Sequence, residues 1–171
     1  QCLMEAMGMA LPGSGTIPAV HTSRLSLSKE SGKAIVKMIE ANLIPSKILT
    51  YNAFENAIMA LMAIGGSTNY VIHLPAIAHE LGLKLDLELF EEISKRVPCL
   101  CGIYPNGSNT IIDLYKAGGM MGVLKRIEDS LHKECLTVSG KTLGEVIKSG
   151  RVTNDEVIRP LGKPFHPGEG I

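Results

Sequence analysis

The sequence predicts an α/β fold, more specifically the helix-rich part of a layered α/β/α domain with a few short strands. The chain has 171 residues, which suits one domain with a sizeable core. Hydrophobic residues make up 45% of it but aromatic residues only 4%, so aliphatic side chains and eight Met residues must fill that core. Apolar residues recur mostly at helical spacing, and only two short stretches have the character of strands.

The first two predicted helices cover residues 1–9 and about 23–42. A loop rich in Pro and Gly at 11–18 separates them, and Pro45 closes the second. Because the chain opens with Gln inside a helical pattern, we expect it to be an interior piece of a longer protein. The second helix keeps a partly helical apolar spacing, at Leu25, Leu27, Ile35, Val36 and Ile39.

The next two helices flank a turn. Thr50 is a good N-cap for the first, and Gly65-Gly66 ends it. Ser67 or Asn69 caps the second, which Gly82 ends. We expect a broad buried face on each, made by Ala53, Phe54, Ala57, Ile58, Leu61 and Met62 in the first and by Val71, Ile72, Leu74, Ile77, Ala78 and Leu81 in the second.

The rest of the chain alternates short helices with two strand candidates. Asp86 caps an amphipathic helix that Pro98 ends, with Leu89, Phe90 and Ile93 inward. Further helices are predicted at 109–117, 120–133 and 142–148, the last capped by Thr142. The strand candidates, 99–104 and 135–138, fit a helical layer on part of a sheet whose other strands lie elsewhere.

Charge and hydropathy exclude several classes of partner. Lys plus Arg and Asp plus Glu both number 17, so no net field would draw nucleic acid or anionic lipid to the surface. No apolar run approaches the ~20 residues that span a bilayer. The first residues lack the pattern of a secretory signal. We therefore expect a cytoplasmic protein without nucleic-acid or membrane partners.

The turn from Gly65 to Asn69 is the best local candidate for a site. A glycine-rich turn that opens a helix offers backbone N–H groups, two hydroxyls and an amide at the positive end of the helix dipole, which suits a carboxylate. The substrate-binding candidates are therefore Ser67, Thr68 and Asn69. The alternative is structural: the glycines end one helix and Ser67 caps the next, as caps commonly do.

Histidine and cysteine give weaker signals. His73 follows Asn69 by one turn and could act as a general base, but its apolar neighbours favour a core histidine. Cys99 and Cys101 lack the spacing of a metal site, so burial as small apolar residues is favoured over a small metal protein. The other histidines are expected at the surface or in caps, namely His21, His79, His132 and His166. Glu55 and Asn56 are expected to form a buried polar pair.

Several motifs together resemble one enzyme family. They are Leu11-Pro-Gly-Ser14, Ala53-Phe-Glu-Asn-Ala-Ile58, Gly65-Gly-Ser-Thr-Asn69, Ile72-His-Leu-Pro-Ala-Ile77, Ala117-Gly-Gly119, Ser139-Gly-Lys-Thr-Leu-Gly-Glu145 and Val157-Ile-Arg-Pro-Leu161. They resemble the dihydroxy-acid and sugar-acid dehydratases, which are iron-sulfur hydro-lyases. The resemblance covers essentially the whole chain and implies an interior portion of such an enzyme. It assigns residues 1–160 to the C-terminal portion of the N-terminal catalytic domain, and 161–171 to a linker towards a C-terminal domain.

The resemblance also implies chemistry that this chain does not carry alone. Family members dehydrate 2,3-dihydroxy acids to 2-keto acids with an iron-sulfur cluster and Mg²⁺. Their cluster cysteines and most Mg²⁺ ligands lie upstream, and a further ligand and the serine base lie in the later domain. Cys2 follows the cluster motif without occupying its ligand position. We therefore expect no catalytic residue, no metal ligand and no bound cofactor in this chain, and no activity without the remainder of the parent enzyme.

The expected parent is a dihydroxy-acid dehydratase of branched-chain amino-acid biosynthesis, the route to isoleucine and valine. Leu89-Phe-Glu-Glu-Ile93 and Ser94-Lys-Arg-Val-Pro98 resemble that branch of the family more than the sugar-acid branch. The first alternative is a dehydratase of sugar acids such as 6-phosphogluconate or an aldonate. The second is a helical interaction module without catalysis. Expected partners are a small dihydroxy acid, the remainder of the parent enzyme, and further copies in a homo-oligomer.

Overall fold

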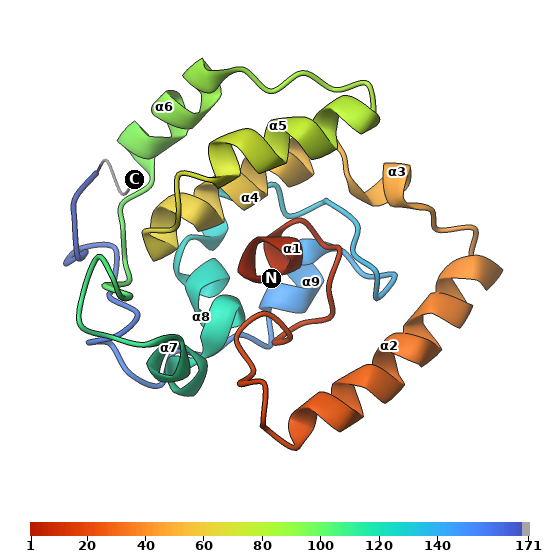
Figure 1. Ribbon diagram of the computed structural model, residues 1–171, viewed down its shortest axis with the longest axis horizontal. Coiled ribbons are helices and arrows are strands. Elements are labelled where there is room, and N and C mark those ends of the chain that lie inside the picture. The colour runs from red at the N-terminus through yellow and green to blue at the C-terminus, as the bar shows by residue number, and fades with distance from the viewer. Residues whose placement is uncertain (169–171) are drawn as a thin grey trace.

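The structure is a computed structural model in which residues 1–168 are described. Short and medium helices joined by loops make up most of it (Figure 1). The helices are α1 (Cys2–Ala6), α2 (Ser23–Glu40), α3 (Pro45–Ile48), α4 (Tyr51–Ile64), α5 (Tyr70–Glu80), α6 (Leu87–Arg96), α7 (Ile111–Ala117), α8 (Gly119–Arg126) and α9 (Leu143–Ile147), with a 3₁₀ turn at Glu128–Ser130. Within the described part, no helix is long and apolar enough to cross a membrane.

Helix α4 forms the centre of the fold. It packs against α1, α5, α6 and α8, and its residues from Ala57 to Ile64 are all apolar. The Thr50 hydroxyl accepts the Ala53 N–H at 3.3 Å, as an N-cap does, and Gly65 ends the helix with φ of +60°. Both predicted ends of this helix are confirmed. The buried residues of α4 are Ala53, Phe54, Asn56, Ala57, Ile58, Met59, Ala60, Leu61, Met62 and Ala63.

Asn56 is the polar exception among these buried residues, and the fold supplies it with partners. Its side chain is fully buried, and its amide donates to the His132 carbonyl at 3.0 Å and accepts the His132 N–H at 2.8 Å. One side chain therefore satisfies both backbone groups of a residue in the loop that follows α8. The burial predicted for Asn56 is confirmed, and its bonds join α4 to a segment 76 residues further along the chain.

Two short helices begin with reciprocal caps. In α9 the Thr142 hydroxyl accepts the Glu145 N–H, while the Glu145 carboxylate accepts the Thr142 N–H at 2.8 Å. The cap predicted at Thr142 is thus confirmed. Helix α7 has the same arrangement between Thr110 and Asp113, so its cap lies one residue after the predicted start at Asn109. Asp86 does stand at the start of α6, but its carboxylate pairs with Lys84 instead of capping the helix.

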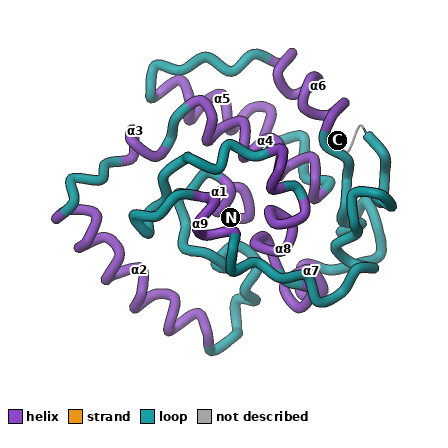
Figure 2. Tube along the Cα trace, turned by 180° about the vertical axis from the view of Figure 1, so that it is seen from behind, coloured by secondary structure: helices purple, strands orange, loops and turns teal. Residues whose placement is uncertain are grey.

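The buried face predicted for α5 is largely wrong, and α2 has no buried face despite its apolar spacing. Helix α2 contains no buried residue, and it lies at the edge of the molecule in both Figure 1 and Figure 2. In α5 only Leu74 and Ala78 are buried, whereas Ile72 is 71% exposed. The spacing of apolar residues is correct for a helix, but no described element covers those faces. Pro45, expected only to close the α2 segment, also begins the short helix α3.

The helix-rich class is confirmed, but neither predicted strand forms a ladder among residues 1–168. Only isolated β-bridges occur at these places: Cys99 with His166, Ile103 with Asn109, and Leu136 with Thr142. The reason is that the backbone finds partners outside any strand: Leu100 donates to the Ala63 carbonyl at the end of α4, and Val138 donates to the Gly8 carbonyl. The helix predicted at 120–133 likewise ends early, at Arg126, before the 3₁₀ turn.

The segment after residue 160, which the family resemblance assigns to a linker, is bonded to the rest of the fold in its described part. The Phe165 N–H donates to the Cys99 carbonyl at 2.8 Å, and the Phe165 ring lies against Gly102. A side chain at Gly102 would meet that ring at 2.6 Å, so the close packing requires glycine. Residues 169–171 of the predicted linker lie outside the described residues, and the division into domains stays a prediction.

Replacing Asn56 tests how much the join between α4 and His132 stabilises the fold. We expect Asn56→Ala to lower the free energy of unfolding by about 2 to 4 kcal/mol, because it removes a fully buried side chain, leaves the part-buried His132 N–H without its acceptor, and leaves the Cys135 N–H as the remaining donor to the His132 carbonyl. Asn52→Ala is the matched control on the same helix, since Asn52 is less buried and bonds only to the exposed Glu134. It should cost less than about 1 kcal/mol. Equal losses in urea unfolding would show that the buried amide has no special role.

Candidate functional site

The predicted substrate-binding turn joins the end of α4 to the start of α5. The Gly65 and Gly66 N–H groups donate to the Met62 and Leu61 carbonyls at 3.1 and 3.0 Å, so these glycines complete the C-terminal cap of α4. The Ser67 hydroxyl accepts the Asn69 N–H at 3.2 Å. The glycines therefore do end α4, as the structural alternative predicted. Their N–H groups are already bonded and are not available to a ligand.

Other donors of the turn remain available. Ser67, Thr68 and Asn69 are all exposed. The backbone N–H groups of Ser67 and Thr68 have no acceptor within the described part of the chain. Both precede α5, where the partial positive charge of a helix N-terminus favours an anion. The turn thus combines free N–H groups with hydroxyls and an amide, and whether it binds a substrate stays a prediction.

Asn106 supports this turn from a distant part of the chain. Its side-chain amide donates to the Gly65 carbonyl at 2.8 Å, across 41 residues of sequence. The Cys99 thiol lies directly behind the same glycine, since a Cβ there would stand 2.9 Å from the sulfur. The turn is therefore clamped between two segments. Sequence reasoning missed Asn106; the only signal was an Asn within the turn-forming run Tyr104-Pro-Asn-Gly107.

His73 is not the core histidine that its neighbours suggested. It is exposed and makes an edge contact with Tyr70, with ring centroids 6.2 Å apart. The apolar residues around it in sequence face other directions on α5, and only Leu74 among its direct neighbours is buried. His73 therefore lies on the solvent side of the helix that follows the turn.

The burial predicted for Cys99 and Cys101 is confirmed. The Cys99 thiol donates to the Cys101 carbonyl at 3.4 Å. Burial raises the pKa of Cys101 to about 12, with smaller contributions from Cys99 and Cys2, and burial also raises the pKa of Cys99. Thiols held in the protonated form are poor metal ligands. Among residues 1–168, no group of three or more His, Cys, Asp and Glu side chains is placed to hold a metal ion.

Glu55 takes part in a polar contact beside Asn56. Its carboxylate lies 2.7 Å from His132 Nε2 and 3.9 Å from the Arg96 guanidinium. The pair of polar residues expected on α4 therefore exists, but Glu55 and Asn56 bind different parts of the same residue, His132, and not each other. This contact fixes the loop after α8.

A second polar cluster, which sequence reasoning missed, surrounds Glu5 on α1. The buried Glu5 carboxylate accepts the Gly13 N–H at 2.7 Å and also the Gly15 N–H. A Cβ at Gly15 would stand 2.7 Å from the Glu5 oxygen, so only glycine allows this approach. The signal in the sequence was an acid in an apolar helix followed by Gly13-Ser-Gly15. Glu5 holds the 11–15 loop in place.

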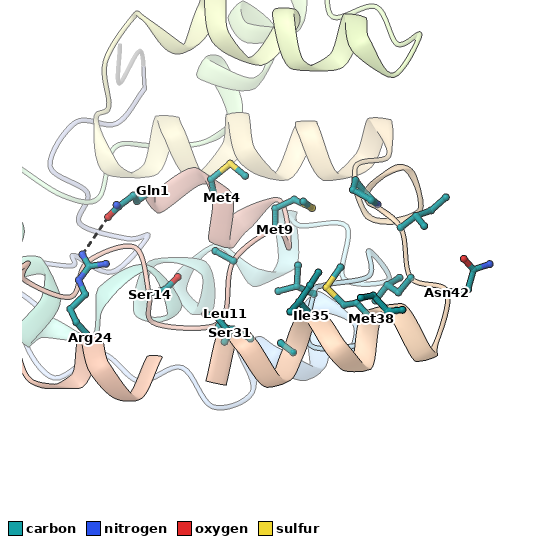
Figure 3. A pocket seen from close by; sticks show the side chains of 17 residues that line it. Gln1, Met4, Met9, Leu11, Ser14, Arg24, Ser31, Ile35, Met38 and Asn42 are labelled. Carbon is teal, nitrogen blue, oxygen red and sulfur yellow. Dashed lines mark hydrogen bonds between the residues drawn. The ribbon is translucent and has the colours of Figure 1, made fainter. Parts of the chain in front are cut away.

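That loop forms part of a large groove in the described structure. The groove has a volume of about 790 Å³ and runs between α2 on one side and α1 with the 9–14 loop on the other (Figure 3). Met9 lies across it from Ile35 and Met38 (Figure 3), and Met4 and Leu11 also line it. Its lining is mostly apolar, and it lies apart from the Gly65–Asn69 turn, none of whose residues line it.

The family of the chain follows from comparison with known proteins. A family model described as the N-terminal part of dihydroxy-acid/6-phosphogluconate dehydratases matches residues 1–146. The chain belongs to this dehydratase family. The match includes α1 to α8, the Gly65–Asn69 turn and the residues that line the groove.

Relatives within the dehydratase family are similar over nearly the full chain. Proteins named dihydroxy-acid dehydratase from Ignicoccus hospitalis and Caldanaerobacter subterraneus are each 51% identical to it, and one from Pyrococcus furiosus is 48% identical. Each alignment covers 99% of this chain. The chain spans 31% of the length of each of these relatives.

The buried Glu5 predicts a pH dependence of stability. Burial raises the pKa of Glu5 from 4.5 to about 6, although the Gly15 and Gly13 N–H groups lower it. Between these two values the folded chain binds more protons than the unfolded chain, so stability falls as pH rises through this window. The loss should reach about 2 kcal/mol above pH 6.

Urea unfolding of the native chain and of Glu5→Gln across that pH window measures this effect. Glutamine cannot ionise, so the part of the slope that belongs to Glu5 should disappear in the variant, whatever its absolute stability. Glu40→Gln, at an exposed site on α2, is the control and should keep the native slope. Parallel profiles for the native chain and Glu5→Gln would contradict the assignment.

Proposed function

We propose that this chain forms part of a dihydroxy-acid dehydratase, an enzyme that converts 2,3-dihydroxy carboxylic acids to 2-keto acids in branched-chain amino-acid biosynthesis. The observation that carries the proposal is 51% identity, over 99% of this chain, to a protein named dihydroxy-acid dehydratase. Isoleucine and valine are the expected end products. We also propose that the parent enzyme is cytoplasmic and forms a homo-oligomer.

The proposed reaction removes one water from the substrate. A proton leaves C2 and the hydroxyl leaves C3, and the enol that results becomes the 2-keto acid when its C2 hydroxyl loses a proton and C3 gains one. The role proposed for this chain is to hold the substrate carboxylate at the Gly65–Asn69 turn. Free N–H groups at Ser67 and Thr68, their hydroxyls, and the Asn69 amide support this role.

The described residues do not fit either of the cofactors that the family resemblance implies. No suitable group of ligands exists among residues 1–168, and the cysteines nearest the turn are buried with raised pKa values. We propose that an iron-sulfur cluster and Mg²⁺ belong to the parent enzyme and are held by residues outside this chain. The chain alone then supplies scaffold and one wall of the site, and has no turnover of its own.

A sugar acid is the competing substrate class. The family model includes 6-phosphogluconate dehydratases in its description, and a turn that binds a carboxylate would suit sugar acids such as an aldonate equally well. Identity to relatives named dihydroxy-acid dehydratase favours the branched-chain substrate.

A hybrid enzyme tests the proposal. In it, this chain replaces the matched part of the Ignicoccus hospitalis relative, and the purified hybrid is assayed with 2,3-dihydroxyisovalerate, 6-phosphogluconate and gluconate. We expect turnover of the first by the hybrid and no turnover by the isolated chain. Ser67→Ala combined with Thr68→Val should raise KM at least about tenfold, which corresponds to the loss of one hydrogen bond to a charged group.

The control for this hybrid is Ser28→Ala, on the exposed side of α2, which should leave KM unchanged. A KM that does not change in the Ser67 and Thr68 variant would exclude these two hydroxyls from the substrate site. A hybrid that dehydrates the sugar acids but not 2,3-dihydroxyisovalerate would establish the competing substrate class.

A further inference from the structure

The groove beside α2, which we call the α2 groove, has the character of a docking surface. Six apolar side chains dominate its two walls, namely Met4, Met9 and Leu11 on one side and Ile35, Met38 and Ile39 on the other. Three of them are Met, whose flexible and polarizable side chain adapts to the apolar side chains of a partner. Water in such a groove would hydrate apolar surface that an apolar occupant would bury.

Among the α-helices of residues 1–168, α2 packs least against the core. No residue of its 18 is buried, and Ile35 and Ile39 are 52% and 73% exposed although both line the groove. A helix that places apolar residues along one side normally packs that side on a core. Here the groove separates α2 from α1, so an occupant of the groove would supply the packing that the apolar side of α2 lacks.

Charge gives a second indication of what fits. The Arg24 guanidinium lies at one end of the groove and donates to the Ile17 carbonyl at 2.6 Å and to the Gln1 side-chain oxygen at 3.5 Å (Figure 3). Both acceptors are neutral, and no carboxylate of the described residues lies within ion-pair distance of Arg24. A carboxylate on the occupant would complete this end of the groove.

We propose that the α2 groove binds an apolar polypeptide segment from the remainder of the parent dehydratase, with an acidic side chain directed at Arg24. Relatives that match 99% of this chain are about three times as long, so most of such a protein lies outside the matched part and is available as the occupant. A second copy of the chain is the competing occupant, and the oligomeric state of the isolated chain distinguishes it. The inference rests on the proposed function only in treating the chain as part of a longer dehydratase.

Two neighbouring residues of α2 provide a matched test. Ile35 lines the groove and is 52% exposed, whereas Val36 is 53% exposed and does not line it. In the isolated chain, Ile35→Asp and Val36→Asp should each change Tm by less than about 2 °C, as exposed substitutions do. In the hybrid with the Ignicoccus hospitalis relative, Ile35→Asp should lower Tm by at least about 5 °C, because the aspartate would be buried without a partner, and Val36→Asp should not.

Arg24 gives an independent readout in the same hybrid. Arg24→Gln should lower Tm at low salt by several degrees, and by clearly less in about 1 M salt, because salt weakens the attraction to the proposed carboxylate. In the isolated chain the same substitution should show no such salt dependence, since Arg24 bonds there only to neutral oxygens.

Defined outcomes would overturn the proposal. If Ile35→Asp changes the Tm of the hybrid no more than Val36→Asp does, the groove stays open in the longer protein. If the isolated chain forms a dimer that Ile35→Asp dissociates in analytical ultracentrifugation, a second copy is the occupant. If the hybrid does not fold, overlapping synthetic peptides from the unmatched parts of the relative are tested for binding to the isolated chain. The proposal is supported if one peptide binds and Ile35→Asp weakens that binding at least tenfold while Val36→Asp does not. It is overturned if no peptide binds.

Activity separates this inference from the proposed function. A hybrid that lacks dehydratase activity but shows the difference between Ile35→Asp and Val36→Asp would refute the function and keep the docking site. An active hybrid whose Tm changes with neither substitution would support the function and refute the docking site.

Discussion

The fold depends on the burial of α4, and that burial is possible because the polar groups of this helix have partners. Asn56 satisfies both backbone groups of His132, Thr50 caps the first turn, and the Gly65-Gly66 amides close the last one. Without these bonds the apolar faces of α4 could enter the core only with unpaired polar groups, at a cost of several kcal/mol in total. The neighbouring helices α1, α5, α6 and α8 all pack on the surface that results.

The same helix also places the candidate site. The Gly65–Asn69 turn follows α4 directly, so the buried helix holds the first residue of this exposed turn in a fixed position. Leu100 donates to the carbonyl of Ala63, and this bond sets the 99–101 segment behind the turn, while Asn106 holds it from the side. An exposed group of donors on a rigid support is an arrangement that suits recognition, because little ordering is needed when a ligand binds.

The features predicted correctly from the sequence are those that depend on residues close together along the chain. The caps at Thr50 and Thr142, the end of α4 at Gly65, and the burial of Cys99 each need only near neighbours or strong apolar character. The exposure of His73 and the lack of strand ladders among residues 1–168 could not be predicted, because both depend on which elements lie alongside. The role of Asn106 depends on a contact across 41 residues, which periodicity does not report.

The lack of buried residues in α2 also bears on how the isolated chain moves, with the α2 groove empty. Opening of a helix costs little when it breaks no core contact, so α2 can unfold locally while α4 and its neighbours stay intact. The amide hydrogens of α2 would then exchange with solvent far faster than those of α4, and a protease would find its first cleavage sites there. The chain would thus contain two cooperative units with different lifetimes, a durable one around α4 and a transient one formed by α2.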